Sequence, residues 1–462
     1  MNLIENRLFD DINIGDSAHL IKTLEQKDIQ LFAVMSGDIN PMHIDKEFAQ
    51  NDMFHEIIAH GMWGGSLIST VLGTQLPGPG TIYLEQSLKF LHPIYLNDTV
   101  TVTLTALEKD NKKNIIQFGC KVVTQKNIIA IEGTARVIAP KIKISRPRQE
   151  IPQIHFHDKG KIFQELISRT QSSSPIITAV VHPVDSVSLV GAIESAQANL
   201  ITPILIGPEH KIKYAAKEAG INIEAYTIIP TLHSHAAAAK AVELARAGDV
   251  QAIMKGALHT DELMHEVVSQ ETGLLTARRI SHVFIIDVPT YNRPLLITDA
   301  AINVYPSLED KRDIVQNAID LAIALGIKCP HVAILSAIET VYPKITSTIE
   351  AAALCKMAER GQITGGILDG PLAFDTAISK IAAQTKGLTS VISGDVDILV
   401  VPDLESGNML AKQLEYLAEA QVAGIVLGAR IPIILTSRAD GVLARMTSCA
   451  LAKIMLQKTT TP

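Results

Sequence analysis

The hydrophobic pattern changes near residue 140, and no other feature of the sequence limits the possible folds as much. Residues 99–107, TVTVTLTAL, alternate Thr with Val or Leu, the period of two that is typical of a half-buried strand. Two further apolar runs follow after polar turns, at 115–123 and 128–139, and together they predict an antiparallel meander. From about residue 158, short β-rich runs alternate with helical stretches, which indicates a parallel, doubly wound α/β architecture. We therefore expect two domains of different fold class.

A helix is expected in the first domain at residues 59–76, AHGMWGGSLISTVLGTQL. This stretch is apolar nearly all round, so the helix must be buried on most of its sides. Gly61, Gly64 and Gly65 are poor helix formers, but they allow a sheet to approach the helix closely. The sequence therefore predicts an α+β domain in which a central helix is wrapped by an antiparallel sheet.

The segment between the two domains reads PKIKISRPRQEIPQIHFH and contains three prolines and four basic residues without periodicity, as expected for a linker. The whole chain of 462 residues is too long for a single ordinary core. We expect a first domain at 1–140, a linker at 141–157 and a second domain at 158–462. The second domain is long for one sheet, so we expect two lobes with a cleft.

The composition of the chain argues against a nucleic-acid-binding or membrane protein. The net charge is −7 and basic residues are not concentrated anywhere, which argues against a nucleic-acid partner. No run of 18 apolar residues and no basic-then-apolar signal pattern occurs, so no membrane partner is expected. The four cysteines are far apart and are expected to be reduced thiols: Cys120, Cys329, Cys355 and Cys449. We expect a soluble, cytoplasmic protein.

Residues 36–43, SGDINPMH, are the first candidate site. Pro41 makes a helix interior unlikely here, whereas a tight Asn-Pro turn can bring Asp38 and His43 to one point. An acid and an imidazole aimed at one point can hold and deprotonate a water molecule. Alternatively, Asp38 only forms the turn and His43 is a surface histidine.

A second candidate site follows the apolar run IPIILT, where Ser437 can cap the next helix and Arg438 follows at once. A strand, a capping hydroxyl and a helix N-terminus with an added guanidinium make an anion site. A purely structural helix cap is the alternative. The second domain has no GxxxxGK[ST], no GxSxG and no metal-spaced His/Cys cluster.

The stretch FAVMSGDINPMHIDKEFA resembles the motif of the MaoC-like (R)-specific enoyl-CoA hydratases, which have a hot-dog fold, and the resemblance extends over roughly residues 10–138. It implies that Asp38 and His43 are a catalytic pair that orients water and moves its protons. Gly61 matches a position whose backbone N–H faces the thioester oxygen, and a helix N-terminus favours negative charge there. Ser69 matches a serine that supports the active site.

From about residue 160 to the end, the chain resembles the phosphate acetyl/butyryl transferases, and the butyryltransferase branch more closely. The stretches ILDGPLAFDTAIS and MKGALHTDEL carry this resemblance, which implies acyl transfer between CoA and inorganic phosphate. Ser437 and Arg438 match the pair that stabilises developing charge and holds phosphoryl oxygens. Where acetyltransferases have an acid later in that helix, this chain has Ala444, and Asp440 is the nearest acid that can substitute.

Several residues of the second domain are expected to bind substrate through the same resemblance. The run ALHTDELMHEV lacks the phosphate-binding Arg of the acetyltransferases but, with the preceding MKG, offers Lys255, His259 and Thr260. Gly407 and Asn408 match a segment that lines the cleft, although a simple helix start would also explain them.

Both resemblances together imply a bifunctional enzyme of short acyl-CoA metabolism: a hot-dog hydratase domain followed by a two-lobed phosphotransacylase-like domain. CoA thioesters and inorganic phosphate are its substrates, with no tightly bound cofactor or metal. A homo-oligomer is expected through the hot-dog domain, the transferase domain or both. Two alternatives stay open. The second domain is only a CoA-binding or assembly module, as the missing Arg suggests, or it is a nicotinamide-dependent dehydrogenase, against which the absence of GxGxxG counts.

Overall fold

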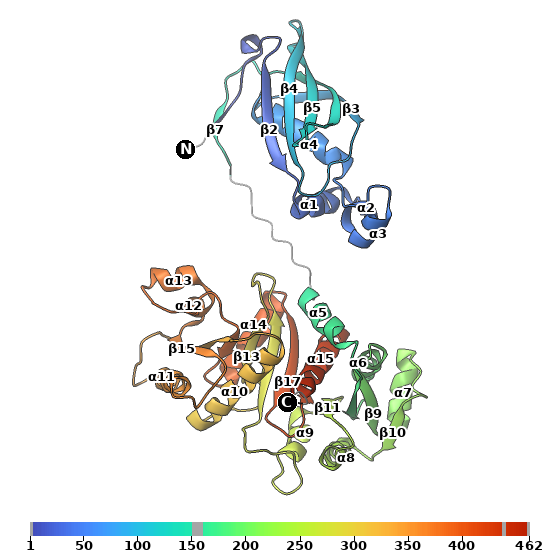
Figure 1. Ribbon diagram of the computed structural model, residues 1–462, viewed down its shortest axis with the longest axis vertical. Helices are drawn as coiled ribbons and strands as arrows, with labels where there is room; N and C mark the ends of the chain where they lie inside the picture. The colour runs from blue at the N-terminus through green and yellow to red at the C-terminus, as the bar shows by residue number, and fades with distance from the viewer. Residues whose placement is uncertain (1–2, 150–159, 437–439, 460–462) are drawn as a thin grey trace. The chain divides into compact units, whose positions relative to one another are not determined.

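The computed structural model describes residues 3–149, 160–436 and 440–459 of the chain. It divides into two compact units, Met1–Phe156 and His157–Pro462 (Figure 1). Within the described residues, no helix combines the length and the apolar character needed to cross a membrane.

The first unit is built on an antiparallel sheet with the strand order β2-β4-β5-β6-β3. In β4, the side chains of Val100, Val102 and Leu104 are fully buried while the Thr residues between them are partly exposed. The predicted meander is therefore confirmed. The strands are β2 (Ser17–Thr23), β3 (Ile82–Phe90), β4 (Thr99–Asp110), β5 (Ile115–Thr124) and β6 (Ile129–Ile138).

The predicted central helix is α4 (Gly61–Thr74), which packs against this sheet (Figure 1). A Cβ atom on Gly64 would lie 2.3 Å from Cδ1 of Ile131 in β6, so only glycine fits at this position. Within the described unit the helix is less enclosed than predicted, because Met62 and Ser69 are exposed on one side of it.

Short helices precede α4: η1 (Phe9–Asp11), α1 (Gln26–Ser36), α2 (Pro41–Ile44) and α3 (Lys46–Asn51). A helix interior was expected to be unlikely in the stretch SGDINPMH, and a short helix does occur there, but it begins at Pro41. Pro41 is the first residue of α2, where its missing N–H costs nothing, and the Asn40 side chain accepts a hydrogen bond from Met42 N at the N-cap. The turn and the helix are thus consecutive, and His43 lies on the helix.

The segment expected to be a linker from residue 141 onward is in part structured. Strand β7 (Ser145–Pro147) pairs antiparallel with β1 (Leu3–Glu5). Between them, the buried Asn6 amide donates to Ile142 O at 2.8 Å and accepts from Ile144 N at 2.9 Å. The first unit therefore extends to at least residue 147; residues 150–157 of the expected linker lie outside the described residues.

A fragment ending at residue 140 is expected to be less stable than one ending at 149. The shorter fragment loses four hydrogen bonds that hold Asn6 and its backbone. At about 0.5–1.5 kcal/mol net for each bond, the free energy of unfolding should fall by about 2–6 kcal/mol. Urea unfolding of both fragments measures the difference, and equal midpoints would show that the β1–β7 pair contributes nothing.

In the described part of the second unit, eleven strands form one mixed sheet in the order β10-β9-β8-β11-β18-β17-β12-β13-β16-β14-β15. The expectation that the unit is too long for one sheet is thus wrong, and the sheet is not wholly parallel because β12 and β17 run antiparallel to their neighbours. Its strands are β8 (Ile176–Val181), β9 (Ile201–Gly207), β10 (Thr227–Pro230), β11 (Ala252–Lys255), β12 (Ser281–Asp287), β13 (Leu295–Thr298), β14 (His331–Leu335), β15 (Ile367–Leu372), β16 (Ile398–Val400), β17 (Gln421–Leu427) and β18 (Ile433–Ile434).

Helices cover both faces of this sheet. One face carries a single continuous core, packed by α5 (Lys161–Thr170), α6 (Ser186–Gln197), α7 (Glu209–Ala219), α10 (Leu308–Ala324), α11 (Thr346–Glu359) and α15 (Val442–Thr459). On the other face the core is split in two, which gives the unit two halves. One part lies under α8 (Ser234–Ala247) and α9 (Thr260–Val267). The other part lies under α12 (Phe374–Ile378) and α14 (Leu404–Leu417); α13 (Lys380–Thr385) comes between these two helices in the sequence.

The antiparallel strands determine where the other strands end. β8, β11 and β18 are parallel, so their C-terminal ends lie together on one side of the sheet. We call this side, where β11 ends with Lys255, the Lys255 edge. β13 and β16 run in the opposite direction, because β12 runs with β18 and β13 is antiparallel to β12. They end at the other edge, which we call the Asn303 edge.

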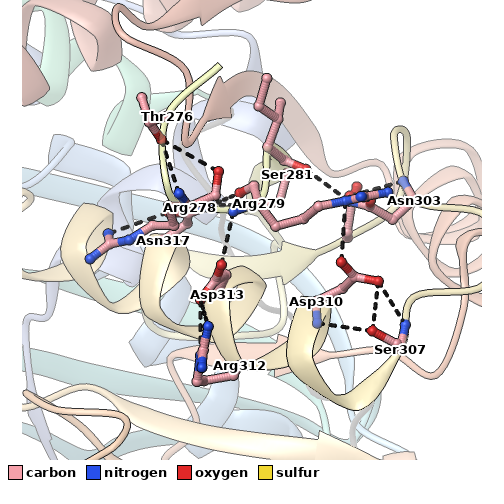
Figure 2. A network of polar contacts seen from close by, with 12 residues as sticks. Thr276, Arg278, Arg279, Ser281, Asn303, Ser307, Asp310, Arg312, Asp313 and Asn317 are labelled. Carbon is pink, nitrogen blue, oxygen red and sulfur yellow. Dashed lines mark hydrogen bonds and ion pairs between the residues drawn. The ribbon is translucent and has the colours of Figure 1, made fainter. Parts of the chain in front are cut away.

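At the Asn303 edge, α10 holds the segment that leads into β12 (Figure 2). Asp310, Asp313 and Asn317 follow one another at helical spacing, so they share one face of α10. Asp313 accepts from Arg279 N at 2.9 Å, and the Asn317 amide donates to Ser281 Oγ at 2.8 Å. This network fixes the entry into β12.

Candidate active sites

The local fold places Asp38 in a tight turn. Helix α1 ends at Gly37, whose φ of 75° is left-handed and therefore suits glycine. The turn then continues with Asn40 N donating to Asp38 Oδ1 at 3.2 Å. Asp38 is exposed, so its carboxylate can meet a ligand.

His43 is buried, and its ring is oriented by the backbone. Nδ1 lies 2.9 Å from Ile58 O, and since a carbonyl only accepts, Nδ1 carries the proton and Nε2 of the neutral ring keeps a lone pair. Burial lowers the pKa of His43, and the hydrogen bond to Ile58 opposes this only in part. The ring is therefore neutral at pH 7 and able to accept a proton.

His60 lies beside this pair, although it was not among the residues predicted for the site. Its side chain is 2% exposed, and its ring centroid lies 4.0 Å from that of His43 and 4.9 Å from that of Phe32. Its Nε2 lies 3.0 Å from the backbone oxygen of Asp38. One atom from each of Asp38, His43 and His60 lies within 4.8 Å of the other two. A histidine directly before Gly61, in the first turn of the expected buried helix, was the available signal.

Gly61 and Ser69, the two remaining predicted residues of this site, lie at different places along α4. Gly61 directly follows His60 and is the first residue of α4, so its N–H is one of those that the helix itself leaves unbonded. Ser69 lies two turns further, roughly 12 Å along the helix axis. Its side chain is exposed. Its supporting role stays a prediction.

The rate of any reaction that uses His43 as a base should stay close to its maximum as the pH falls from 7 to 6.5. A group with a lowered pKa takes up its proton only below the ordinary histidine value of 6.5. The acidic limb of kcat/KM is therefore expected below pH 6.5, where His43 becomes protonated. A pH–rate profile measures this; an acidic limb centred above pH 6.5 would exclude His43 as the titrating base.

In the second unit, the predicted residues of MKGALHTDEL lie at the Lys255 edge. Lys255 is the last residue of β11, and its buried ammonium donates to Thr436 O at 3.4 Å. His259 caps α9 and Thr260 begins it, so the free N–H groups of this helix start are close by in sequence. The strand order turns back between β8 and β11, and ligands bind at such points outside the ends of parallel strands.

Ser437 and Arg438 lie outside the described residues, but both flanks of this pair are described. The buried Arg445 of α15 donates from Nη1 to Thr436 Oγ1 at 2.8 Å and from Nε to Asp440 O at 3.3 Å. A Cβ on Gly191 would lie 2.4 Å from Cδ of Arg445, so a glycine makes room for it. No pattern in the sequence had pointed to Arg445, which directly follows Ala444.

Gly407 and Asn408 are not brought to these residues. They lie in α14, which follows β16 and therefore begins at the Asn303 edge. Gly407 is buried against Asp299 and Ala300, and Asn408 Nδ2 donates to Ala300 O at 3.3 Å. The strand directions thus place Gly407 and Asn408 at the opposite edge of the sheet from Lys255, and their role in binding substrate stays a prediction.

Comparison with known proteins agrees with both units. Residues 231–453 match the family "Phosphate acetyl/butaryl transferase", and residues 15–127 match the "MaoC like domain". A phosphate acetyltransferase of Rhizobium meliloti is 61% identical over 292 residues, which cover 63% of this chain and 92% of the relative. A phosphate butyryltransferase of Clostridium acetobutylicum is 38% identical, over 64% of this chain and 98% of the relative.

These identities correct one expectation, because the relative named acetyltransferase, not the one named butyryltransferase, is the more similar of the two. Among solved structures, a branched-chain phosphotransacylase from Enterococcus faecalis is 28% identical, with a TM-score of 0.53, over 60% of this chain and 99% of that chain. The chain therefore belongs to the phosphate acetyl/butyryl transferase family and carries a MaoC-like domain, of the hot-dog fold, in front of its transferase domain.

Proposed function

We propose that the protein is a bifunctional enzyme of short acyl-CoA thioesters. Its first unit hydrates trans-2-enoyl-CoA to (R)-3-hydroxyacyl-CoA. Its second unit transfers an acyl group between CoA and inorganic phosphate. The observation that carries the first activity is the approach of the Asp38 carboxylate to the neutral, buried His43 within 4.8 Å.

Hydration requires a water oxygen to bond to C3 and a proton to reach C2. The Asp38 carboxylate accepts a hydrogen bond from the water, and Nε2 of His43 is the base that can take its proton. The pair then returns a proton to C2, so that its own protonation is unchanged after one turnover. Negative charge that develops on the thioester oxygen is stabilised by the N–H of Gly61 at the start of α4.

For the transferase, the support is the 61% identity to a relative named phosphate acetyltransferase. The thiolate of CoA attacks the carbonyl carbon of acetyl phosphate, phosphate leaves, and the thioester forms; the reverse reaction consumes acetyl-CoA. Lys255 supplies positive charge at the Lys255 edge, and Ser437 and Arg438 hold the phosphoryl oxygens. Acetyl groups are favoured over butyryl groups, as the relatives suggest.

A substrate panel on the full chain tests both activities. Crotonyl-CoA should lose its enoyl absorbance without added phosphate, and acetyl-CoA should lose its thioester absorbance only with phosphate or arsenate. Absence of the first reaction would refute the hydratase, and absence of the second would refute the transferase.

A second candidate for the transferase unit is a CoA-binding module without turnover. Ala444 stands where the resemblance implies an acid, and this departure favours it. Binding of CoA without phosphate-dependent loss of any short acyl-CoA would establish this alternative.

A further inference from the structure

Three side chains of the first unit form an arrangement that goes beyond an acid–base pair. The carboxylate of Asp38 and the rings of His43 and His60 each offer one ligand atom, and these atoms lie within 4.8 Å of one another. Two imidazoles and one carboxylate are a ligand set that divalent transition metals bind. Both histidines are buried, whereas Asp38 is exposed, so an ion would enter from the side of Asp38.

Each of the two histidines has one ring nitrogen hydrogen-bonded to a backbone carbonyl, as metal-binding histidines usually do. Such a ligand usually donates its second ring N–H to a carbonyl or a carboxylate, which fixes the tautomer. His43 makes this bond to Ile58 O through Nδ1, and His60 makes it to Asp38 O through Nε2. The lone pairs are therefore left on Nε2 of His43 and on Nδ1 of His60.

The free nitrogen of His60 is a separate observation that points to a ligand. Nδ1 of His60 is buried and has no hydrogen-bond partner among the described residues. Leaving a buried polar atom without a partner is unfavourable, and a bound ion would remove this cost. Catalysis by Asp38 and His43 alone does not explain why this nitrogen is buried without a hydrogen-bond partner.

We propose that Asp38, His43 and His60 bind a divalent transition-metal ion of the Zn²⁺ class, and that the bound ion inhibits hydration. This proposal rests on the proposed hydratase function for its effect, but not for the binding itself. The ion takes the lone pair of His43 that would otherwise accept a proton, and it takes the Asp38 carboxylate that would hold the water. Occupancy of the site by metal and catalysis therefore exclude each other.

Metal binding is measured first, without reference to activity. Co²⁺ is titrated into the metal-free full chain, its visible absorption is followed, and Zn²⁺ is then used to displace it. The wild type is expected to bind about one ion per chain that the variants Asp38→Asn and His60→Gln do not bind. Loss of a ligand should weaken binding at least about 100-fold, because loss of an outer partner alone costs about 10–100-fold.

The variants are chosen to keep the fold. His60→Gln keeps an N–H group that can reach Asp38 O, and Asp38 is exposed in a turn. His55→Asn is the matched control: His55 is exposed in the same unit, lies outside the cluster, and has a φ of 63° that asparagine tolerates. Circular dichroism of each variant checks the fold. If His60→Gln does not fold, Asp38→Asn alone tests whether the ion binds at this cluster.

Hydration of crotonyl-CoA is then followed with increasing Zn²⁺ and again after EDTA. Inhibition that follows occupancy of the site and is reversed by EDTA supports the proposal. It is overturned if the wild type binds no ion, if Asp38→Asn and His60→Gln bind like the wild type, or if the filled site still hydrates at the full rate. If metal-free wild type does not hydrate crotonyl-CoA, the hydratase function fails, while the titration still decides whether the metal site exists.

Discussion

Replacing Asp38 by Asn, or His43 by Asn, is expected to lower the rate of crotonyl-CoA hydration by about 10²–10⁴-fold, the usual contribution of a positioned acid or base. Asp38→Asn keeps the size of the side chain and removes only its charge. His43→Asn removes the neutral ring whose Nε2 faces the site. The loss of enoyl absorbance at saturating substrate measures the effect on kcat.

Two controls make this result specific. Phosphate-dependent turnover of acetyl-CoA by the same preparations should be unchanged, since the transferase residues lie in a separate compact unit. The variant His55→Asn should hydrate at the wild-type rate, because this exposed histidine lies outside the cluster. Near-normal hydration by both the Asp38 and the His43 variant would remove them from the reaction.

In the transferase, replacing Lys255 by Met or Arg438 by Ala is expected to slow phosphate-dependent loss of acetyl-CoA by roughly 10–150-fold. This range corresponds to about 1.5–3 kcal/mol for one charge-assisted contact made in the transition state. Arg438→Ala should chiefly raise the concentration of phosphate that is required. Lys255→Met preserves the length of a side chain that is buried at the end of β11.

An exposed lysine of the same unit provides the matched control. Lys217 lies in the last turn of α7, and Lys217→Met should leave the transferase rate unchanged. Crotonyl-CoA hydration should be unaffected in every one of these variants. If Lys255→Met and Arg438→Ala both retain the wild-type rate and phosphate requirement, the anion is held elsewhere.

Local patterns in the sequence predicted the first unit well. The alternation in TVTVTLTAL reflects a strand with one buried and one solvated face. The glycine at position 64 is required by the close approach of β6 to α4. The motif SGDINPMH was sufficient to pair Asp38 with His43, because turn and helix follow each other within a few residues. His60 could not be assigned in the same way, since its contacts with Asp38 and His43 join segments that are distant in sequence.

In the second unit the alternation of strands and helices was predicted, but the antiparallel directions of β12 and β17 were not. An apolar run such as SHVFIIDVP has the same composition whether its neighbours are parallel or antiparallel. Only the pairing of β12 with β13 and β17 shows that Gly407 and Lys255 lie at opposite edges. The role of residues 141–147 was missed for a similar reason, because proline-rich segments without periodicity can still pair with a distant strand such as β1.

The position of β18 and α15 has a consequence for the synthesis of the protein. β11 pairs with β18 on one side, and the buried Lys453 of α15 donates to Ser173 O, 280 residues earlier in the chain. Until these last elements leave the ribosome, the backbone of β11 has an open edge on the side where β18 later pairs with it. The core packed by α5, α6 and α7 also lacks α15. At about 5–20 residues per second, the nascent chain carries this open edge for many seconds. The first unit is complete long before, so the two units should differ in their need for chaperones, and a chain that stops before β18 should aggregate through β11.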